Sequence, residues 1–298
     1  MNKGFYTAMG TPVTAEGVFC WNSMARHVEQ QIDAGVSGML VMGSMGMQPY
    51  IKNSEYAKVA ACSAETAAGR APVLVGVTDM SIGRVLERIE ALKGIKGIDG
   101  VVSTLPYYSP CNQQHAYDFY NEIAKNSPWP VYMYDLPDAV KTAIAPDTVK
   151  KLWKNPNIKG IKSGNMVTHR ILMRTEEKPE DFTMMFSNID EFDIAYKFGI
   201  DKNLDGMFSA TPATAKKMYA ALDAGDYAAA GNYLDDILEL RDMFLATGTL
   251  LRGAFTHAMN LLGCDGIYGR DYEKDATDEW KEKIAALILK SCPESTIR

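Results

Sequence analysis

Two side chains in the sequence could together carry out chemistry on a carbonyl group. Lys162 closes the short run IKGIK, and Tyr134 lies 28 residues earlier, near the end of the run PVYMYD. A lysine in an apolar environment loses the hydration of its charged form, so the neutral amine becomes accessible and can form a Schiff base. A phenol beside it could pass protons to the carbinolamine and to a departing alkoxide. The alternatives are a lysine that reaches solvent or pairs with a carboxylate, and a buried tyrosine with a satisfied hydroxyl.

The alternation of side chains along strands would bring the two groups together. In the lysine run, a period of two puts Ile158, Gly160 and Lys162 on one face of the strand. By the same rule, Tyr134 shares its face with Tyr132. If both faces look into a closed sheet, the amine and the phenol meet inside it.

A third candidate is the glycine-flanked turn Gly43-Ser44-Met45-Gly46, which follows an apolar run. Backbone N–H groups in such turns form anion-binding nests, and the Ser44 hydroxyl would add a further donor for a carboxylate. An ordinary tight turn has the same sequence.

No motif for a nucleotide, a metal or another nucleophile accompanies these residues. The sequence lacks G-x-x-x-x-G-K-[ST], G-x-S-x-G, H-E-x-x-H and a strand-following G-x-G-x-x-G. Its four histidines show no ligand spacing, so neither a metal nor another cofactor is predicted. Five scattered cysteines without a C-x-x-C pair are typical of reduced, buried thiols. They are Cys20, Cys62, Cys111, Cys264 and Cys292.

The strands that could position these residues recur along the first three-quarters of the chain. Eight short β-rich runs begin 24 to 34 residues apart, which is the length of a strand–helix unit with short loops. The runs begin at Gly4, Gly38, Pro72, Gly100, Pro130, Ile158, Phe182 and Gly206.

Helical periodicity fills the segments between the runs. Apolar stripes over residues 56–67 and 116–124 predict amphipathic helices, with Asn53 or Ser54 capping the first and Asn112 the second. Near-continuous apolar strands that alternate with such helices predict a parallel sheet covered by helices. Eight units close into a (β/α)8 TIM barrel, an α/β fold whose active site lies at the carboxyl ends of the strands.

The strand pattern stops after Thr211 and helices follow. They are expected over residues 212–224, 226–247, 250–262 and 278–289. We expect the first to complete a catalytic barrel domain, residues 1–224. The remainder, residues 225–298, predicts a C-terminal helical appendage packed on the barrel, because no Pro-, Gly- or Ser-rich linker separates the two parts.

Composition excludes several other functions. The 298 residues include 31 lysines and arginines against 37 aspartates and glutamates, a net charge of −6, so neither nucleic acid nor a membrane surface is an expected partner. With 47% hydrophobic residues the chain can bury a large core. No apolar stretch is long enough for a signal peptide or a membrane span, which favours a cytoplasmic enzyme.

Four of these motifs, in this order and spacing, resemble a known family. They are the GSMG turn, the PYY that ends at Tyr108, the YDLP that begins at Tyr134, and the KGIK that ends at Lys162. Together with the G-T-P from Gly10, they resemble the dihydrodipicolinate synthase/N-acetylneuraminate lyase superfamily. The likeness runs from the first strand through the eighth.

The resemblance implies a class I, metal-free aldolase on a TIM barrel. The lysine matching Lys162 would condense with the keto group of pyruvate or another 2-oxo acid, and the tyrosine matching Tyr134 would relay protons. Ser44 and Tyr108 would extend the relay, with Tyr108 reaching in from a neighbouring subunit of a homotetramer, a dimer of dimers. The backbone of Gly43, Ser44 and Met45 would hold the substrate carboxylate.

The chain also departs from the family pattern. The strand-two turn usually reads G-[ST]-T-G-E, whereas Met45 replaces the second hydroxyl residue here and Met47 replaces the glutamate. Carboxylate binding would then depend on backbone amides and Ser44. Asp135 stands where the family has asparagine, which adds a potential negative charge near the rim.

Residue comparison within the superfamily bears on the substrate. The synthases carry an arginine two positions after the Y-N-x-P proline, where Ala139 stands here. The lyases that act on sialic acid and related sugar acids have a small residue there, an Asp-Glu pair after strand seven and a serine ending strand eight. Asp190, Glu191 and Ser209, with the preceding Phe208, match these substrate-binding positions. The alternative for the acidic pair is charge favoured at a helix N-terminus.

The sequence therefore predicts a Schiff-base aldolase that cleaves or forms a 2-oxo-3-deoxy (sugar) acid, with pyruvate as one partner. Two alternatives within the family are dihydrodipicolinate synthase (4-hydroxy-tetrahydrodipicolinate synthase) and a 2-oxo-3-deoxy acid dehydratase that uses the same imine. An alternative from another class is a non-catalytic 2-oxo acid binding protein on the same barrel.

Overall fold

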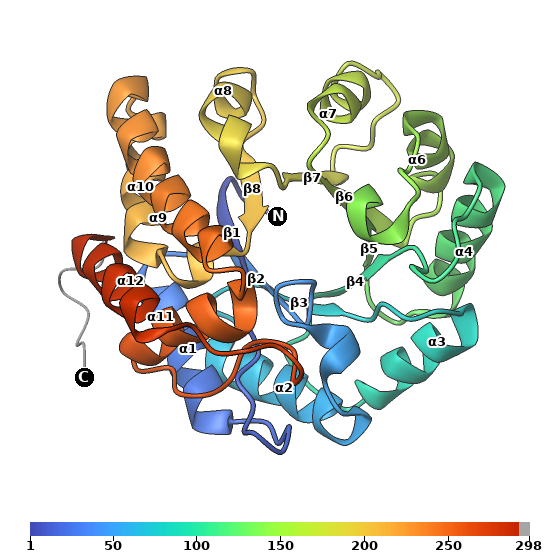
Figure 1. Ribbon diagram of the computed structural model, residues 1–298. Helices are drawn as coiled ribbons and strands as arrows, with labels where there is room; N and C mark the ends of the chain where they lie inside the picture. The colour runs from blue at the N-terminus through green and yellow to red at the C-terminus, as the bar shows by residue number, and fades with distance from the viewer. Residues whose placement is uncertain (292–298) are drawn as a thin grey trace.

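The computed structural model describes residues 1–291 and shows a closed barrel of eight parallel strands ringed by helices (Figure 1). Each strand pairs with the next in chain order, and β8 pairs with β1. The strands are β1 (Gly4–Ala8), β2 (Gly38–Val41), β3 (Val73–Gly76), β4 (Gly100–Thr104), β5 (Val131–Asp135), β6 (Ile158–Ser163), β7 (Thr183–Phe186) and β8 (Lys202–Asp205). The predicted TIM barrel is confirmed.

Helices follow the strands and cover the outside of the barrel (Figure 1). They are α1 (Trp21–Asp33), α2 (Asn53–Ala67), α3 (Ile82–Ala91), α4 (Gln113–Asn126), α5 (Pro137–Val140), α6 (Pro146–Leu152), α7 (Met166–Met173), α8 (Phe192–Lys197) and α9 (Pro212–Asp223). Three single turns, η1 (Gln48–Tyr50), η2 (Ile189–Glu191) and η3 (Met207–Ser209), lie in loops after β2, β7 and β8.

The predicted helical stripes are buried as their spacing requires. In α2 the apolar stripe from Tyr56 to Ala67 faces the core. The side chain of Asn112 caps α4 by accepting from the backbone N–H of His115, as predicted. The expected cap of α2 is wrong, because Lys52 precedes its first turn and makes no side-chain capping bond.

Buried side chains separate into an inner and an outer layer. The inner layer joins residues of seven strands inside the barrel, and the outer layer fills the space between strands and helices. The inner side chains are Tyr6, Ala8, Leu40, Leu74, Val102, Tyr132, Tyr134, Met185 and Leu204. Tyr132 and Tyr134 therefore share the inner face, as their alternation along β5 predicted.

A bulge in β6 changes one prediction about its faces. Tyr132 pairs with Gly160 while the preceding Val131 pairs with Ile158, so Lys159 is an extra residue in β6. Ile158 consequently lies in the outer layer and does not share a face with Lys162, contrary to strict alternation. Beyond the bulge the register is regular, and Lys162 pairs with Tyr134.

The eighth strand lies four residues earlier than predicted. The run from Gly206 is not a strand, because its middle forms the turn η3. Strand β8 is instead the polar segment Lys202–Asp205, which pairs along β1. The Asp205 carboxylate accepts from the backbone N–H of Met207 over 2.8 Å, and this bond turns the chain out of the barrel.

The C-terminal part is helical, as predicted. It comprises α10 (Tyr227–Ala246), a π-helical turn η4 (Leu250–Phe255), α11 (Thr256–Leu261) and α12 (Asp278–Ser291). Leu234, Ile237 and Ile284 from these helices belong to the same buried cluster as the outer layer of the barrel. A domain boundary near residue 224 stays a prediction.

The structure also bears on the predicted reduced cysteines and on membrane-spanning helices. Within residues 1–291 the cysteines are free thiols, with Cys62 and Cys264 buried and Cys20 and Cys111 half-buried. Cys292 lies outside the described residues. None of the helices described is long and apolar enough to cross a membrane.

Candidate active site

Lys162 and Tyr134 lie side by side at the carboxyl ends of β6 and β5. The Lys162 Nζ atom stands over the Tyr134 ring, 3.8 Å from its centroid. Both side chains are buried, with 6% and 5% of their surfaces exposed. In its ammonium form, a lysine over the negative face of an aromatic ring is attracted by the ring quadrupole, and this contact places the nitrogen beside the phenol.

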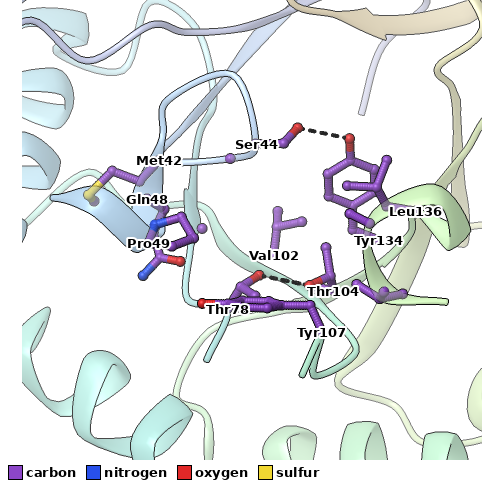
Figure 2. Close-up of a pocket in the computed structure, with 14 residues that line it drawn as sticks. Met42, Ser44, Gln48, Pro49, Thr78, Val102, Thr104, Tyr107, Tyr134 and Leu136 are labelled. Carbon is purple, nitrogen blue, oxygen red and sulfur yellow. Dashed lines mark hydrogen bonds between the residues drawn. The ribbon is translucent and has the colours of Figure 1, made fainter. Parts of the chain in front are cut away.

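Ser44 binds the phenol from the turn after β2. Its Oγ atom lies 3.1 Å from the Tyr134 hydroxyl, and either oxygen could donate (Figure 2). The turn is positioned by Met42, whose φ of 53° is in the left-handed region. A Cβ on Gly76 at the end of β3 would lie 1.9 Å from the Met42 carbonyl oxygen, so the close approach of the two backbones requires glycine there.

A cavity of about 100 Å³ opens beside this hydrogen bond. Its lining residues are Met42, Gly43, Ser44, Gln48, Pro49, Gly76, Thr78, Val102, Thr104, Tyr107, Tyr134, Leu136, Ala139 and Val140. None of these lining residues is charged. Lys162 is not one of them, and Tyr134 contacts both the amine and the cavity. The predicted residues Gly43, Ser44 and Tyr134 are thus brought together at one site.

Sequence reasoning gave no role to the lining residues Gln48, Thr78 and Thr104, and it identified Tyr107 only as part of the PYY motif. Figure 2 shows Gln48 and Pro49 across the cavity from Tyr134. The signal for the threonines was available, because they lie at or just after the ends of β3 and β4, where barrel enzymes place functional residues. No sequence motif marked Gln48.

Polar contacts behind β6 hold the strand that carries Lys162. The Asp135 carboxylate accepts from the Ser163 hydroxyl over 2.8 Å and from the backbone N–H of Ile144 over 2.9 Å. The ring of His169 bonds the Ser163 carbonyl oxygen over 3.0 Å. Burial raises the pKa of Asp135 and lowers the pKa of His169 to about 4. The acidic group expected at the rim is therefore enclosed, 3% exposed, and bonds the side chain of Ser163 at the end of β6.

The two tyrosines of the PYY motif differ in their surroundings. Tyr107 lines the cavity, while Tyr108 is 85% exposed and contributes nothing to the lining. Within one chain, the structure does not bring Tyr108 to Lys162.

The other predicted substrate-binding residues lie outside the cavity lining, four of them around β7 and β8 and Met45 in the turn after β2. Asp190 is half-exposed on η2 and pairs with Arg241 of α10 over 2.5 Å, and Glu191 beside it is exposed. Phe208 packs against Phe5, with ring centroids 5.6 Å apart. The Ser209 hydroxyl donates to the Ala8 carbonyl oxygen over 2.9 Å, and Met45 packs on the inner layer of the barrel.

The described part of the chain contains no group of three or more His, Cys, Asp or Glu side chains that could hold a metal ion. The chemistry available at the site is that of an amine, a phenol and a hydroxyl. On a closed parallel barrel this arrangement suits covalent catalysis on a carbonyl compound.

Comparison with known proteins agrees with that class. Residues 1–290 match the model of the dihydrodipicolinate synthetase family, and the chain belongs to this family. It is 29% identical over 248 residues to 4-hydroxy-tetrahydrodipicolinate synthase of Bartonella bacilliformis, covering 82% of this chain and 84% of the relative. The corresponding synthase of Koribacter versatilis is 30% identical over 183 residues, 61% of each protein.

A solved structure shows the same fold. N-acetylneuraminate lyase of Proteus mirabilis superposes with a TM-score of 0.86 at 20% identity, over 97% of this chain and 98% of the lyase. The family and its relatives are carbon–carbon lyases of the class I aldolase type, which use a lysine Schiff base, and the chain is an enzyme of this class.

Proposed function

We propose that the enzyme cleaves or forms a 2-oxo-3-deoxy sugar acid, with pyruvate as product or substrate, as an N-acetylneuraminate lyase-like aldolase. The observation that carries the proposal is the buried Lys162 amine on the Tyr134 ring, with the phenol bonded to Ser44. These three groups supply a nucleophile and a proton relay at the carboxyl ends of the strands.

In the cleavage direction Lys162 adds to the C2 carbonyl of the substrate. Tyr134 gives its proton to the departing hydroxyl of the carbinolamine, which leaves as water, and a protonated imine remains. The Tyr134 oxygen then accepts the C4 hydroxyl proton as the C3–C4 bond breaks and its electron pair moves toward the imine nitrogen. This releases the aldehyde and leaves an enamine. Protonation of C3 and hydrolysis of the imine release pyruvate and the free amine.

The substrate carboxylate would be held by the turn after β2. Gly43 and Ser44 line the cavity, and the backbone N–H groups of Ser44 and Met45 supply donors without a cation. Asp190, Glu191, Phe208 and Ser209 stay candidate sugar-binding positions on the β7–β8 side.

A synthase remains a second candidate, because the curated relatives named above are 4-hydroxy-tetrahydrodipicolinate synthases. Two observations favour a sugar acid. Ala139 lies in the cavity wall at the position where the synthases carry arginine, and the lining residues include no cation to meet a second carboxylate. Two further alternatives are a dehydratase that uses the same imine and a 2-oxo acid binding protein without turnover. The experiments described below distinguish them from an aldolase.

The same proposal extends to assembly and location. We propose a cytoplasmic homotetramer, a dimer of dimers, in which the exposed Tyr108 enters a neighbour's site and extends the relay through Tyr134. The expected partner is a small 2-oxo acid, with neither nucleic acid nor membrane involved.

Borohydride trapping tests the covalent step. Incubation with pyruvate followed by reduction should add the pyruvyl mass to the peptide that contains Lys162, and Lys162→Arg should abolish the adduct. Lys159→Arg is the matched control, because Lys159 lies on the same strand but is partly exposed and pairs with Asp181. An unmodified Lys162 in a protein that still binds 2-oxo acids would favour the binding protein. If the adduct forms, pyruvate release from a panel of 2-oxo-3-deoxy acids separates aldolase from dehydratase.

A further inference from the structure

Arg241 connects the C-terminal helices to the rim of the barrel beside β7 and β8. It lies on α10, which packs against α8 and the turn η2 (Figure 1). Its Nη1 atom donates to Oδ2 of Asp190 over 2.5 Å, while Nε and Nη2 donate to the Asp242 carboxylate over 3.0 and 2.8 Å. The Arg241 side chain is 24% exposed and that of Asp190 is 51% exposed. Both side chains therefore keep surface that a ligand can contact.

The two members of this ion pair also keep unused hydrogen-bonding capacity. Within residues 1–291, the second N–H of Nη1 and of Nη2 in Arg241 has no protein acceptor, and Oδ1 of Asp190 has no protein donor. A guanidinium can only donate and a carboxylate can only accept. Arg241 and Asp190 therefore present free donors next to a free acceptor.

The charges that act on Asp205 place this ion pair near the same end of the barrel as Lys162. Asp205 ends β8, and burial raises the pKa of its carboxyl group. The positive charges of Lys162 and Arg241 act against this rise, and the negative charge of Asp190 adds to it. Charges influence a pKa in this way only when they lie close by. The amine and the ion pair therefore both lie near the carboxyl end of β8.

The proposed orientation of the substrate leads toward this ion pair. With the substrate carboxylate at the turn after β2 and C2 bonded to Lys162, the aldehyde half extends toward β7 and β8. One of its hydroxyls would accept from Arg241 while the next donates to Oδ1 of Asp190. A second carboxylate would instead meet two carboxylates, Asp190 and Asp242, around one guanidinium. The ion pair therefore favours an uncharged, polyhydroxylated aldehyde half.

We propose that Arg241 determines specificity by orienting Asp190 and, together with it, binding adjacent hydroxyls on the aldehyde half of the substrate. The inference rests on the proposed function and deepens it, since it assigns a residue of the C-terminal helices to the sugar end of the site. The alternative is an ion pair that only joins α10 to η2, and such surface pairs contribute little to stability. A site that bonds substrate hydroxyls discriminates against an analogue without them, because its polar atoms then stay unpaired.

Condensation of pyruvate with two aldehydes tests the proposal. D-erythrose and butanal have the same number of carbon atoms, and butanal lacks the hydroxyls. Arg241→Met removes the guanidinium, so kcat/KM for erythrose should fall by about tenfold to hundredfold, chiefly through a higher KM for the aldehyde. The value for butanal should change little. Arg241→Lys keeps a charge for Asp190 and should recover part of the loss.

Arg70→Met is the matched control for these variants. Arg70 also donates two hydrogen bonds to a carboxylate, that of Glu29, and both side chains are exposed on the outside of the barrel. Removal of this guanidinium should leave kcat/KM unchanged for both aldehydes.

A double-mutant cycle tests whether Arg241 acts together with Asp190. Asp190→Ala should also lower kcat/KM for erythrose and spare butanal. The double variant should be about as slow as the slower single variant, because the two residues bind the hydroxyls as a unit. Losses that multiply in the double variant would contradict this pairing.

The outcomes separate this inference from the proposed function. A wild-type protein that forms no pyruvate adduct would overturn the aldolase mechanism, whereas Arg241→Met should be trapped at Lys162 as readily as the wild type. Equal losses for erythrose and butanal in Arg241→Met, or no loss, would overturn the role of Arg241.

A binding measurement applies whether or not the wild-type protein turns over. Gluconate carries hydroxyls along its chain and has no keto group, so it cannot form an imine. Its affinity, measured by calorimetry, should fall about tenfold or more in Arg241→Met. The affinity for lactate, which lacks the further hydroxyls, should stay the same. Unchanged affinity for gluconate, or no binding of gluconate by the wild-type protein, would contradict the proposal.

Discussion

At the scale of single residues, Tyr134 has two roles that different atoms carry. Its ring supports the Lys162 amine at 3.8 Å, and its hydroxyl lies 3.1 Å from Ser44. The ring contact positions the nucleophile, whereas only the hydroxyl can transfer a proton. A substitution that removes the oxygen and keeps the ring therefore separates positioning from proton transfer.

We expect Tyr134→Phe to lower kcat by about a hundredfold to ten-thousandfold, the range typical of a lost acid–base group. The pyruvate adduct should still form, more slowly, because the phenyl ring still supports the amine. Ser44→Ala should lower kcat by only about fivefold to tenfold, the effect of one hydrogen bond. Steady-state kinetics with borohydride trapping checks both variants.

Tyr132→Phe is the matched control for that experiment. Tyr132 lies on the same face of β5, two residues before Tyr134, and pairs with Gly160 instead of Lys162. Its hydroxyl should be dispensable for turnover. Comparable losses in Tyr132→Phe and Tyr134→Phe would contradict a specific relay through Tyr134.

The sequence was sufficient to identify reactive polar side chains at the ends of apolar strands. Lys162, Tyr134 and Ser44 stand at the ends of apolar runs, so pattern and residue type together marked them. Arg241 could not be found this way, because its contact with Asp190 is recognised only once α10 is placed beside η2. Asp135 was identified, but its orientation behind β6 depends on the Ser163 hydroxyl, which the sequence does not place.

At the scale of elements, periodicity predicted where hydrophobic strands lie and failed where hydrogen bonding overrides it. Strand β8 contains the polar residues Lys202, Asn203 and Asp205, so apolar content favoured the following run. Pairing with β1 defines the true strand, and the Asp205–Met207 bond ends it. The bulge at Lys159 is likewise a property of pairing, since a single extra residue leaves no compositional trace.

Two glycines provide an element-scale prediction about the turn that carries Ser44. Gly76→Ala would place a Cβ 1.9 Å from the Met42 carbonyl oxygen, so it should lower the free energy of unfolding by about 1–3 kcal/mol. Activity should fall with it, because the turn after β2 must shift. Gly231→Ala, within α10, meets no atom within 4 Å of its new Cβ. This substitution should instead raise the free energy of unfolding by about 0.5–1 kcal/mol.

Urea unfolding measures both effects as changes in midpoint at constant slope. Equal stability of Gly76→Ala and Gly231→Ala would show that the Met42 backbone relaxes freely. The close approach of β2 and β3 would then not be what positions Ser44.

At the scale of the whole molecule, the barrel and the C-terminal helices share a buried cluster, yet one aromatic residue beside the active-site rim stays in solvent. Tyr108 is 85% exposed, although Tyr107 next to it borders the cavity. An exposed large aromatic side chain is not unusual by itself. Its place in the PYY motif is the reason to test whether a second copy of the chain uses it.

Mixing two inactive variants tests whether Tyr108 acts across a subunit interface. Lys162→Ala should lack the nucleophile, and Tyr108→Ala should lack part of the relay, so each alone should be nearly inactive. In a mixed dimer, the site of the Tyr108→Ala chain keeps its own Lys162 and receives an intact Tyr108 from its partner. With random exchange of subunits, activity should recover to about a quarter of the wild-type value, because half of the dimers are mixed and each has one complete site.

If Tyr108 served its own chain, neither site of a mixed dimer would be complete and mixing would restore nothing. A Tyr108→Ala protein that is fully active alone, or a fully active monomer, would remove Tyr108 from the relay and leave Tyr134 and Ser44 to transfer protons within one subunit.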